Sequence, residues 1–107
     1  MDFVNLTPHA INLYGQDGKT LLASIQPTAP AARCKQEAVC CGHVGGVPVY
    51  RMEFGEVENL PEPQEGTVYI VSRLVATAAN RADVLCPGAA VRDEQGRVIG
   101  CVGLSRI

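Results

Sequence analysis

The stretch that decides the fold is "YIVSRLVATAANRADVLCPG", residues 69–88. It continues an apolar run, "TVYIV" (67–71), which has no polar face and is therefore typical of a central strand. Ser72 is a suitable N-cap for a helix that we expect from about Arg73 to Asn80. Residues 83–86 return to extended structure before a turn predicted at Pro87-Gly88. The order is strand, helix, strand.

Towards the N-terminus, two short alternating runs predict strands, "FVNL" (3–6) and "INLY" (11–14). The proline of the intervening "TPHA" denies the ladder one donor, so we expect a bent or bulged first strand. The segment "GQDGK" (15–19) is a strong hairpin turn because Asp-Gly tolerates positive φ. "INLY" should therefore pair with "LLASI" (21–25) in an antiparallel ribbon.

The middle of the chain predicts a strand beginning near Arg33, a flexible glycine-rich connection in "CGHVGG" (41–46), and a further strand "VPVYRMEF" (47–54). The apolar side of this last strand carries three large side chains: Tyr50, Met52 and Phe54. A long acidic loop with two prolines, "GEVENLPEPQEG" (55–66), should follow.

At the C-terminal end, "AAV" (89–91) and "VIGCVGL" (98–104) flank "RDEQGR" (92–97) and predict a final hairpin. The chain has 107 residues, enough for one domain with a single core. We therefore expect one domain over residues 1–107 with an α+β fold: a mostly antiparallel β core, sandwich-like, carrying one principal helix.

The charge and composition exclude several classes of partner. A net charge of -2 gives no overall field that would recruit nucleic acid. No signal-like start or membrane-length apolar run is present, so we expect a cytoplasmic protein with no membrane partner. The five cysteines are then expected to be reduced. Cys34, Cys40, Cys41 and His43 crowd together, but without zinc-knuckle spacing, so we predict no metal.

An anion site is the main candidate chemistry. A helix that starts directly after a central strand directs free backbone N–H groups beyond the strand end, and Arg73 would stand beside the anion held there. We expect Arg73, Thr77, Asn80 and Arg81 to share the polar face of the helix. The full set of predicted ligand-binding residues is Asn5, Thr7, His9, Ser72, Arg73, Thr77, Asn80, Arg92, Asp93 and Arg97.

Simpler readings of these residues stay open. From spacing alone, the helix face is better explained as a solvated surface beside an alanine-rich packing face. His9 can be a polar residue at a strand end, and Arg92 with Asp93 can be turn chemistry. No nucleophile motif, zinc-protease motif or phosphate loop is present, which favours binding without catalysis and predicts no cofactor.

We also expect an obligate oligomer, because the chain has only five aromatic residues with which to build a core. The small-residue stripe of the helix would pack across a two-fold axis. Its members are Val75, Ala78, Ala79 and Ala82.

Three segments, "NLTPHAINLY" (5–14), residues 55–85 and "AVRDEQGRVIGCVGL" (90–104), resemble the first-described family of phage anti-Thoeris proteins. The resemblance implies a phage or prophage protein in the bacterial host cytoplasm. Such a protein sequesters cyclic ADP-ribose isomers made by TIR-domain defence proteins, and in some relatives cyclic oligonucleotides, without cleaving them. It also implies a β-rich dimer or hexamer. The alternatives are a small nucleotide-degrading phage enzyme and a structural or interaction protein with no nucleotide ligand.

Overall fold

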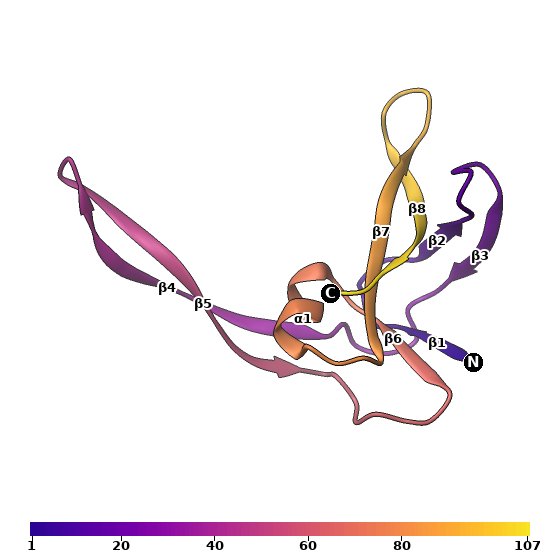
Figure 1. Cartoon of the computed structure of the whole chain (residues 1–107), viewed down its shortest axis with the longest axis horizontal. Helices are drawn as coiled ribbons and strands as arrows, with labels where there is room; N and C mark the ends of the chain where they lie inside the picture. Colours follow the sequence, from indigo (N-terminus) through magenta and orange to yellow (C-terminus); the bar gives the residue numbers. More distant parts are fainter.

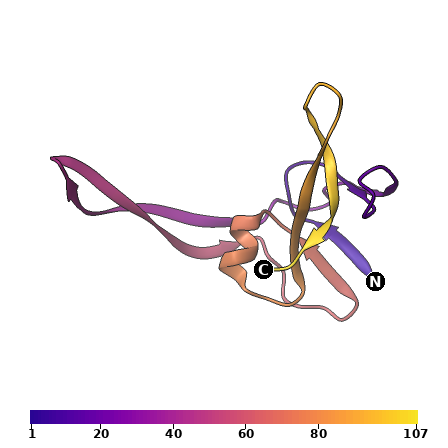
Figure 2. The ribbon, with the colours of Figure 1, turned by 45° about the horizontal axis from the view of Figure 1, so that its top comes forward.

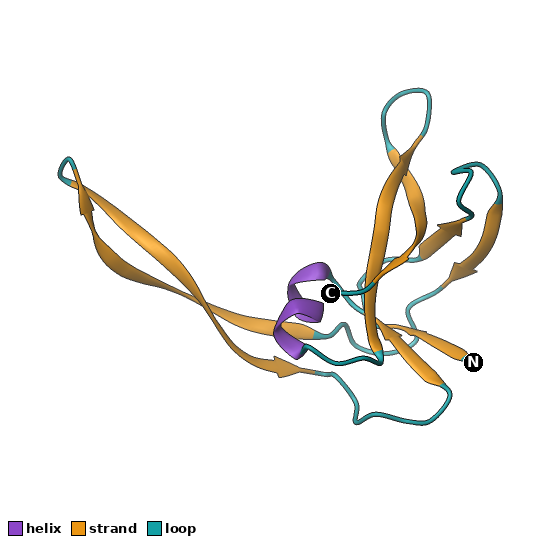
Figure 3. Cartoon of the chain, viewed as in Figure 1, coloured by secondary structure: helices purple, strands orange, loops and turns teal.

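Eight strands and one helix make up the computed structural model, which describes residues 1–107 (Figures 1 and 3). The fold is α+β and mostly β, as the sequence predicts. Six strands form one sheet in the order β1-β6-β7-β8-β2-β3, and the other two form a separate hairpin. The sheet strands are β1 (Asp2–Asn5), β2 (Ile11–Tyr14), β3 (Leu21–Ile25), β6 (Thr67–Ile70), β7 (Val84–Arg92) and β8 (Val98–Ser105). The remaining elements are β4 (Arg33–Val44), β5 (Val47–Glu58) and α1 (Arg73–Ala79).

The six-stranded sheet is mixed. β6 runs parallel to both β1 and β7, and β2 runs parallel to β8. The antiparallel ladders β2–β3, β7–β8 and β4–β5 supply most of the paired residues. Asn5 of β1 bonds to the carbonyl of Ile25, which ends β3, and forms a bridge with Pro27 just beyond it, so the sheet is curled until its two edges touch.

The curled sheet separates two apolar clusters. One lies under α1 and contains Leu6, Ala32, Tyr69, Val71, Val75, Ala76, Val84 and Cys86. The other contains Ile11, Leu13, Ile70 and Cys101. The predicted central strand contributes to both clusters, Tyr69 and Val71 to the first and Ile70 to the second, because successive side chains of a strand point to opposite faces. The prediction of a central strand that is apolar on both faces is confirmed.

The helix begins where the sequence predicts. Ser72 is its N-cap and accepts a hydrogen bond from the Val75 backbone N–H at 3.3 Å. The helix ends at Ala79, and Asn80 closes it in the left-handed region at φ 49°. Asparagine adopts this region more readily than other non-glycine residues.

The predicted faces of the helix need correction. Val75 and Ala76 are buried against the chain's own core, whereas Ala78 and Ala82 are exposed. The small side chains therefore do not form one stripe that is free for a partner. Arg81 lies beyond the helix and pairs with Asp83 through two hydrogen bonds of 2.9 and 2.5 Å. The same guanidinium donates to the Pro61 carbonyl at 3.0 Å, which ties the loop before β6 to the start of β7.

The N-terminal region is not one bent strand. β1 ends at Asn5 and pairs with β6, whereas β2 begins at Ile11 and lies between β3 and β8. The residues between them form a turn. Of the predicted ligand-binding residues Asn5, Thr7 and His9, only Asn5 therefore belongs to a strand.

The turn predicted at Pro87-Gly88 is also absent, since β7 continues through both residues to Arg92. Gly88 is suited to this place because the neighbouring strand, β8, comes very close to it. A Cβ atom at Gly88 would lie 2.1 Å from the Val102 carbonyl oxygen, so only glycine fits.

Strands β4 and β5 form a long hairpin that extends away from the body of the protein, and we call it the arm (Figures 1 and 2). The predicted flexible connection is a tight two-residue turn, with Gly45 at φ 56° and Gly46 at φ 80°. Gly42 belongs to β4, and residues 55–58 of the predicted acidic loop belong to β5. No helix in the structure has the length and apolar character needed to cross a bilayer.

Candidate functional site

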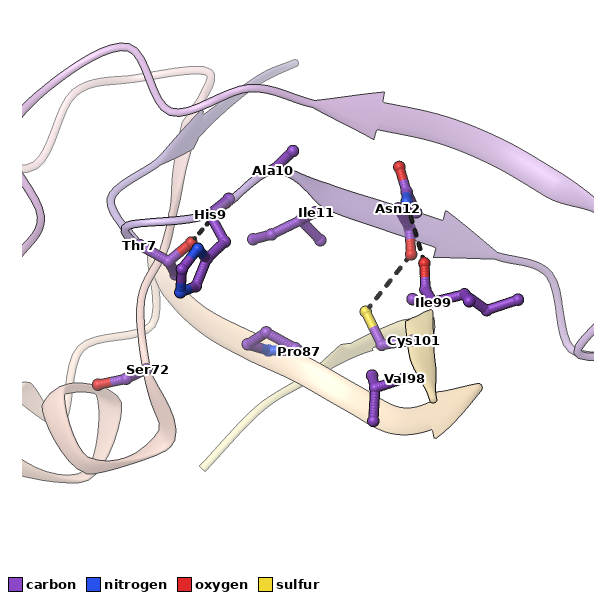
Figure 4. Close-up of a pocket in the computed structure, with 11 residues that line it drawn as sticks. Thr7, His9, Ala10, Ile11, Asn12, Ser72, Pro87, Val98, Ile99 and Cys101 are labelled. Carbon is purple, nitrogen blue, oxygen red and sulfur yellow. Dashed lines mark hydrogen bonds between the residues drawn. The ribbon is translucent and has the colours of Figure 1, made fainter. Parts of the chain in front are cut away.

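A cleft of about 670 Å³ opens between the start of β2, the middle of β7 and the start of β8 (Figure 4). Its lining comes from four parts of the chain that are distant in sequence. The lining residues are Thr7, His9, Ala10, Ile11, Asn12, Ser72, Pro87, Val98, Ile99, Gly100 and Cys101. Three of the ten predicted ligand-binding residues are among them: Thr7, His9 and Ser72.

Thr7 and His9 form the polar end of the cleft. Figure 4 shows the Thr7 hydroxyl and the His9 ring close together, with Ser72 set apart from them at the start of the helix. The Thr7 Oγ1 lies 2.6 Å from Asn5 Oδ1 and 3.0 Å from the His9 carbonyl oxygen. The Thr7 hydroxyl is therefore fixed, whereas the His9 side chain is exposed.

Asn5 supports this polar end from below and does not line the cleft. Its side chain is fully buried. Nδ2 donates to the carbonyl oxygens of His9 and Ile25 at 2.8 and 2.9 Å, and Oδ1 accepts from the Thr7 N–H and hydroxyl. An amide side chain has two N–H donors and one oxygen with two lone pairs, so Asn5 has no capacity left for a ligand. Its role is to hold the turn that positions Thr7 and His9.

The walls of the cleft are mainly apolar. They include Ile11, Pro87, Val98 and Ile99. Asn12 contributes little free polarity, because its Nδ2 donates to the Ile99 carbonyl at 2.9 Å and its Oδ1 accepts from the Ser24 hydroxyl at 2.7 Å. The result is an apolar slot with polar groups at one end.

Cys101 is the thiol at the base of the cleft. Its Sγ lies 3.9 Å from the Asn12 carbonyl oxygen, towards which the thiol hydrogen can point. Burial raises the pKa of this thiol above its usual value, because a thiolate would lose its hydration there. Cys101 is therefore held in the neutral form, which is a poor nucleophile.

The helix contributes Ser72 to the cleft and places Arg73 directly after it. Arg73 is exposed and takes part in none of the four ion pairs of the chain. Thr77 and Asn80 lie outside the cleft lining. Thr77 donates its hydroxyl hydrogen to the Arg73 carbonyl at 2.9 Å, and Asn80 is the C-cap.

The predicted residues of the β7–β8 hairpin are occupied with the turn itself. Asp93 Oδ1 accepts from the backbone N–H groups of Gln95 and Arg97, and Oδ2 accepts from Arg97 Nε at 3.0 Å. The backbone hydrogen bond from Arg97, followed by that residue's side chain, lowers the pKa of the Asp93 carboxyl. Arg92 donates to the Gly96 carbonyl at 2.8 Å. These contacts agree with the simpler interpretation, in which Arg92 and Asp93 only stabilise the turn. None of Arg92, Asp93 and Arg97 lines the cleft.

The cysteine-rich part of the arm shows no metal geometry. All five cysteines are unpaired, and no three His, Cys, Asp or Glu side chains gather where they could hold an ion.

No protein-family model, curated protein or solved structure matches this chain. The candidate site therefore stands on its own geometry. Sequence reasoning missed the apolar walls, above all Val98 and Ile99, because they reach the cleft only through the pairing of β2 with β8. The sequence does contain a signal for them. Val98 and Ile99 are two adjacent apolar residues directly after a turn, a place where a hairpin normally carries polar residues.

Proposed function

We propose that the cleft binds a nucleotide-type ligand and holds it without turnover. The observation that carries the proposal is the cleft itself, an apolar slot of about 670 Å³ with a few polar groups gathered at one end. Binding sites for small molecules are typically concave, mostly apolar and roughly 300 to 1,000 Å³ in volume, with a few polar groups that orient the ligand. A purine face suits the walls formed by Ile11, Pro87 and Ile99.

The polar end suits the remainder of such a ligand. The His9 imidazole can donate to or accept from a ribose hydroxyl or a phosphate oxygen, and the Ser72 hydroxyl can donate its hydrogen. Arg73, next to Ser72 and without an ion-pair partner, is the cation nearest in sequence to this end. A guanidinium is well suited to a diphosphate because its planar fork matches two oxygens.

The resemblance to phage anti-Thoeris proteins makes cyclic ADP-ribose isomers the first ligands to test. Such a molecule offers an adenine face for the walls, ribose hydroxyls for the polar end and a diphosphate for Arg73. In this proposal the protein acts in the cytoplasm of a bacterial host, where a phage or prophage protein would remove the immune signal by sequestration.

Binding without cleavage is supported by the chemistry of the lining. Apart from the Cys101 thiol, His9 is the only one of the eleven lining residues whose side chain can act as an acid or a base, and no carboxylate accompanies it. Hydrolysis of a nucleotide needs an activated nucleophile or a positioned acid and base. The Cys101 thiol is held neutral by its burial and does not fill that role.

One experiment separates the proposal from its alternatives. The purified protein is incubated with TIR-derived cyclic ADP-ribose, washed and heated, and the supernatant is analysed by mass spectrometry. We expect the intact cyclic nucleotide to be released in an amount comparable to that of the protein. A changed mass would identify a nucleotide-degrading enzyme, and absence of any retained nucleotide would favour an interaction protein.

A further inference from the structure

The arm has two chemically different faces. Its register places three cross-strand pairs on one of them, Tyr50 with Cys40, Met52 with Ala38 and Phe54 with Gln36. Gln36 is the only polar residue of the six, and none of them is charged. We call this the apolar face of the arm. Tyr50, Met52 and Phe54 are 58%, 49% and 50% exposed, so about half of each residue is left open to solvent.

The opposite face of the same segment is charged. It carries Glu37 beside Glu53, and Val39 beside Arg51. Arg51 and Glu53 form an ion pair of 3.0 Å along this face. An alternation of apolar and charged residues is the pattern of a strand with one buried and one solvated side. Here the side that the pattern marks for burial is exposed.

The arm is also long for a hairpin that stands alone. Each strand has 12 residues, and the arm packs against the core at its base, where Cys34 and Val57 lie. Figures 1 and 2 show the rest extending away from the body in both views. A two-stranded ribbon is marginally stable at best in water, and needs a further layer on its apolar side.

The accessible surface area shows how much more surface this chain exposes than a compact monomer would. The accessible surface is 7202 Å². A compact monomer of 11.4 kDa would expose about 5,800 Å², so about 1,400 Å² is in excess. The radius of gyration, 16.6 Å, likewise exceeds the roughly 13 Å of a compact chain of this length. A standard stable interface needs only about 800 Å² from each partner.

We propose that the apolar face of the arm packs against the same face of a second copy of this chain. The shape of the face suits this arrangement. Its large side chains all come from β5 and its smaller ones all come from β4, so a ridge runs beside a groove. Two such faces interlock when β5 of one copy lies over β4 of the other. Self-complementarity of this kind is what a two-fold interface requires.

The need for permanent cover also favours a second copy over an unrelated protein. The arm requires its cover whenever the chain is folded, because the ribbon is marginal without it. Another copy of the chain is always present in equal amount. The apolar face also carries no charge with which an oppositely charged partner could be selected. This inference does not depend on the proposed function, because the arm contributes no residue to the cleft.

Sedimentation of the unmodified protein is the primary test. We expect a dimer or a higher even-numbered assembly at about 10 µM and above. A chain that sediments as a monomer at about 100 µM overturns the proposal.

A pair of matched variants tests which face is used. Met52→Glu places a charge on the apolar face, whereas Val49→Glu makes the same kind of change on an exposed position of the opposite face. We expect Met52→Glu to weaken self-association by at least about tenfold, because its carboxylate would lose hydration in the interface. Val49→Glu should leave self-association unchanged. Equal effects of the two variants, or no effect of Met52→Glu, contradict the assignment.

Hydrogen exchange tests the same surface without any substitution, which matters if Met52→Glu does not fold. Amides of residues 36–40 and 50–54 should exchange more slowly at about 100 µM than at about 1 µM protein, since pairing of the arms would suppress local opening. If the arm exchanges at the same rate at both protein concentrations, the proposed pairing with a second copy is contradicted.

Discussion

The Asn5 side chain donates a hydrogen bond of 2.9 Å to the backbone carbonyl of Ile25, and this contact joins the two edges of the six-stranded sheet. Asn5 ends β1 and Ile25 ends β3, the strands at opposite ends of the sheet order. The same side chain also holds the Thr7–His9 turn at the polar end of the cleft. Closure of the sheet and the shape of the candidate site thus depend on one buried amide.

Replacing Asn5 should therefore cost stability. Asn5→Ala leaves the carbonyl oxygens of His9 and Ile25 without their partner, and unsatisfied buried groups cost about 1 to 3 kcal/mol each. We expect a loss of about 2 to 4 kcal/mol in the free energy of unfolding, measured by urea denaturation. Asn12→Ala is the matched control: this more exposed asparagine also bonds across strands, and its replacement should cost less than half as much. Equal losses would show that Asn5 has no special role.

The two histidines provide a matched pair for the cleft. His9 lies in the lining and His43 lies in the arm, and both are exposed. His9→Ala should weaken binding of a cyclic ADP-ribose by about tenfold, because one neutral hydrogen bond in a partly desolvated site is worth about 1 to 1.5 kcal/mol. His43→Ala should leave the affinity unchanged. Isothermal titration calorimetry measures both, and similar affinities for the two variants would remove His9 from the site.

Arg73 is expected to add affinity through its charge. Arg73→Ala should weaken nucleotide binding by about three- to tenfold, a modest factor because the guanidinium is exposed and screened. Arg92→Ala, which removes an arginine occupied with its own turn, should have no effect on affinity. The Arg73 contribution should also shrink as salt is raised from low to physiological concentration. Loss of affinity in Arg92→Ala but not in Arg73→Ala would move the anion site to the β7–β8 hairpin.

The β2–β3 turn should respond to acid through Asp17. Its carboxylate accepts hydrogen bonds from the Thr20 hydroxyl and from the Thr20 and Lys19 N–H groups, and these lower its pKa from 3.8 to about 2. A carboxyl whose pKa is lower in the folded protein contributes stability above its unfolded pKa and loses it as the pH falls towards its folded pKa. That window runs here from about pH 4 down to about pH 2.

Asp17→Asn, which removes the charge but keeps one oxygen acceptor, tests this window. The melting temperatures of the two proteins should differ by a constant amount between about pH 7 and about pH 5, and converge as the pH falls from about 4 to about 2. Thermal unfolding monitored by circular dichroism gives both curves. A difference that persists unchanged at the acid end would mean that the charge of Asp17 is not what stabilises the turn.

The local features of this fold were predictable because short-range chemistry decides them. Asp17-Gly18 makes the β2–β3 turn, Ser72 caps the helix, and Gly96 turns the last hairpin, as the sequence indicates. The errors lie where a distant segment overrides local preference. Pro87 and Gly88 predict a turn locally, but both lie within β7, where β8 passes so close to Gly88 that only glycine fits.

The candidate site was predictable only in part, for the same reason. Thr7, His9 and Ser72 are polar residues at the ends of elements, which local reasoning can find. The walls depend on the pairing of β2 with β8, which brings Leu13 beside Cys101, and no local pattern encodes this pairing. For Arg92 and Asp93 the sequence left turn chemistry open as the simpler interpretation, and the contacts of Arg92 with the Gly96 carbonyl and of Arg97 with Asp93 agree with it.

The sheet order has a consequence for how the protein is made. β1 pairs with β6, Asp2 lying opposite Thr67, and β2 pairs with β8 near Cys101. A ribosome therefore releases the first strands long before the strands that will hold them have been synthesised. During that interval the arm is the longest local hairpin available, and it too lacks cover. The nascent chain therefore passes much of its synthesis with β1 unpaired and β2 held by β3 alone, and the sheet can close only after β6 and β8 have emerged.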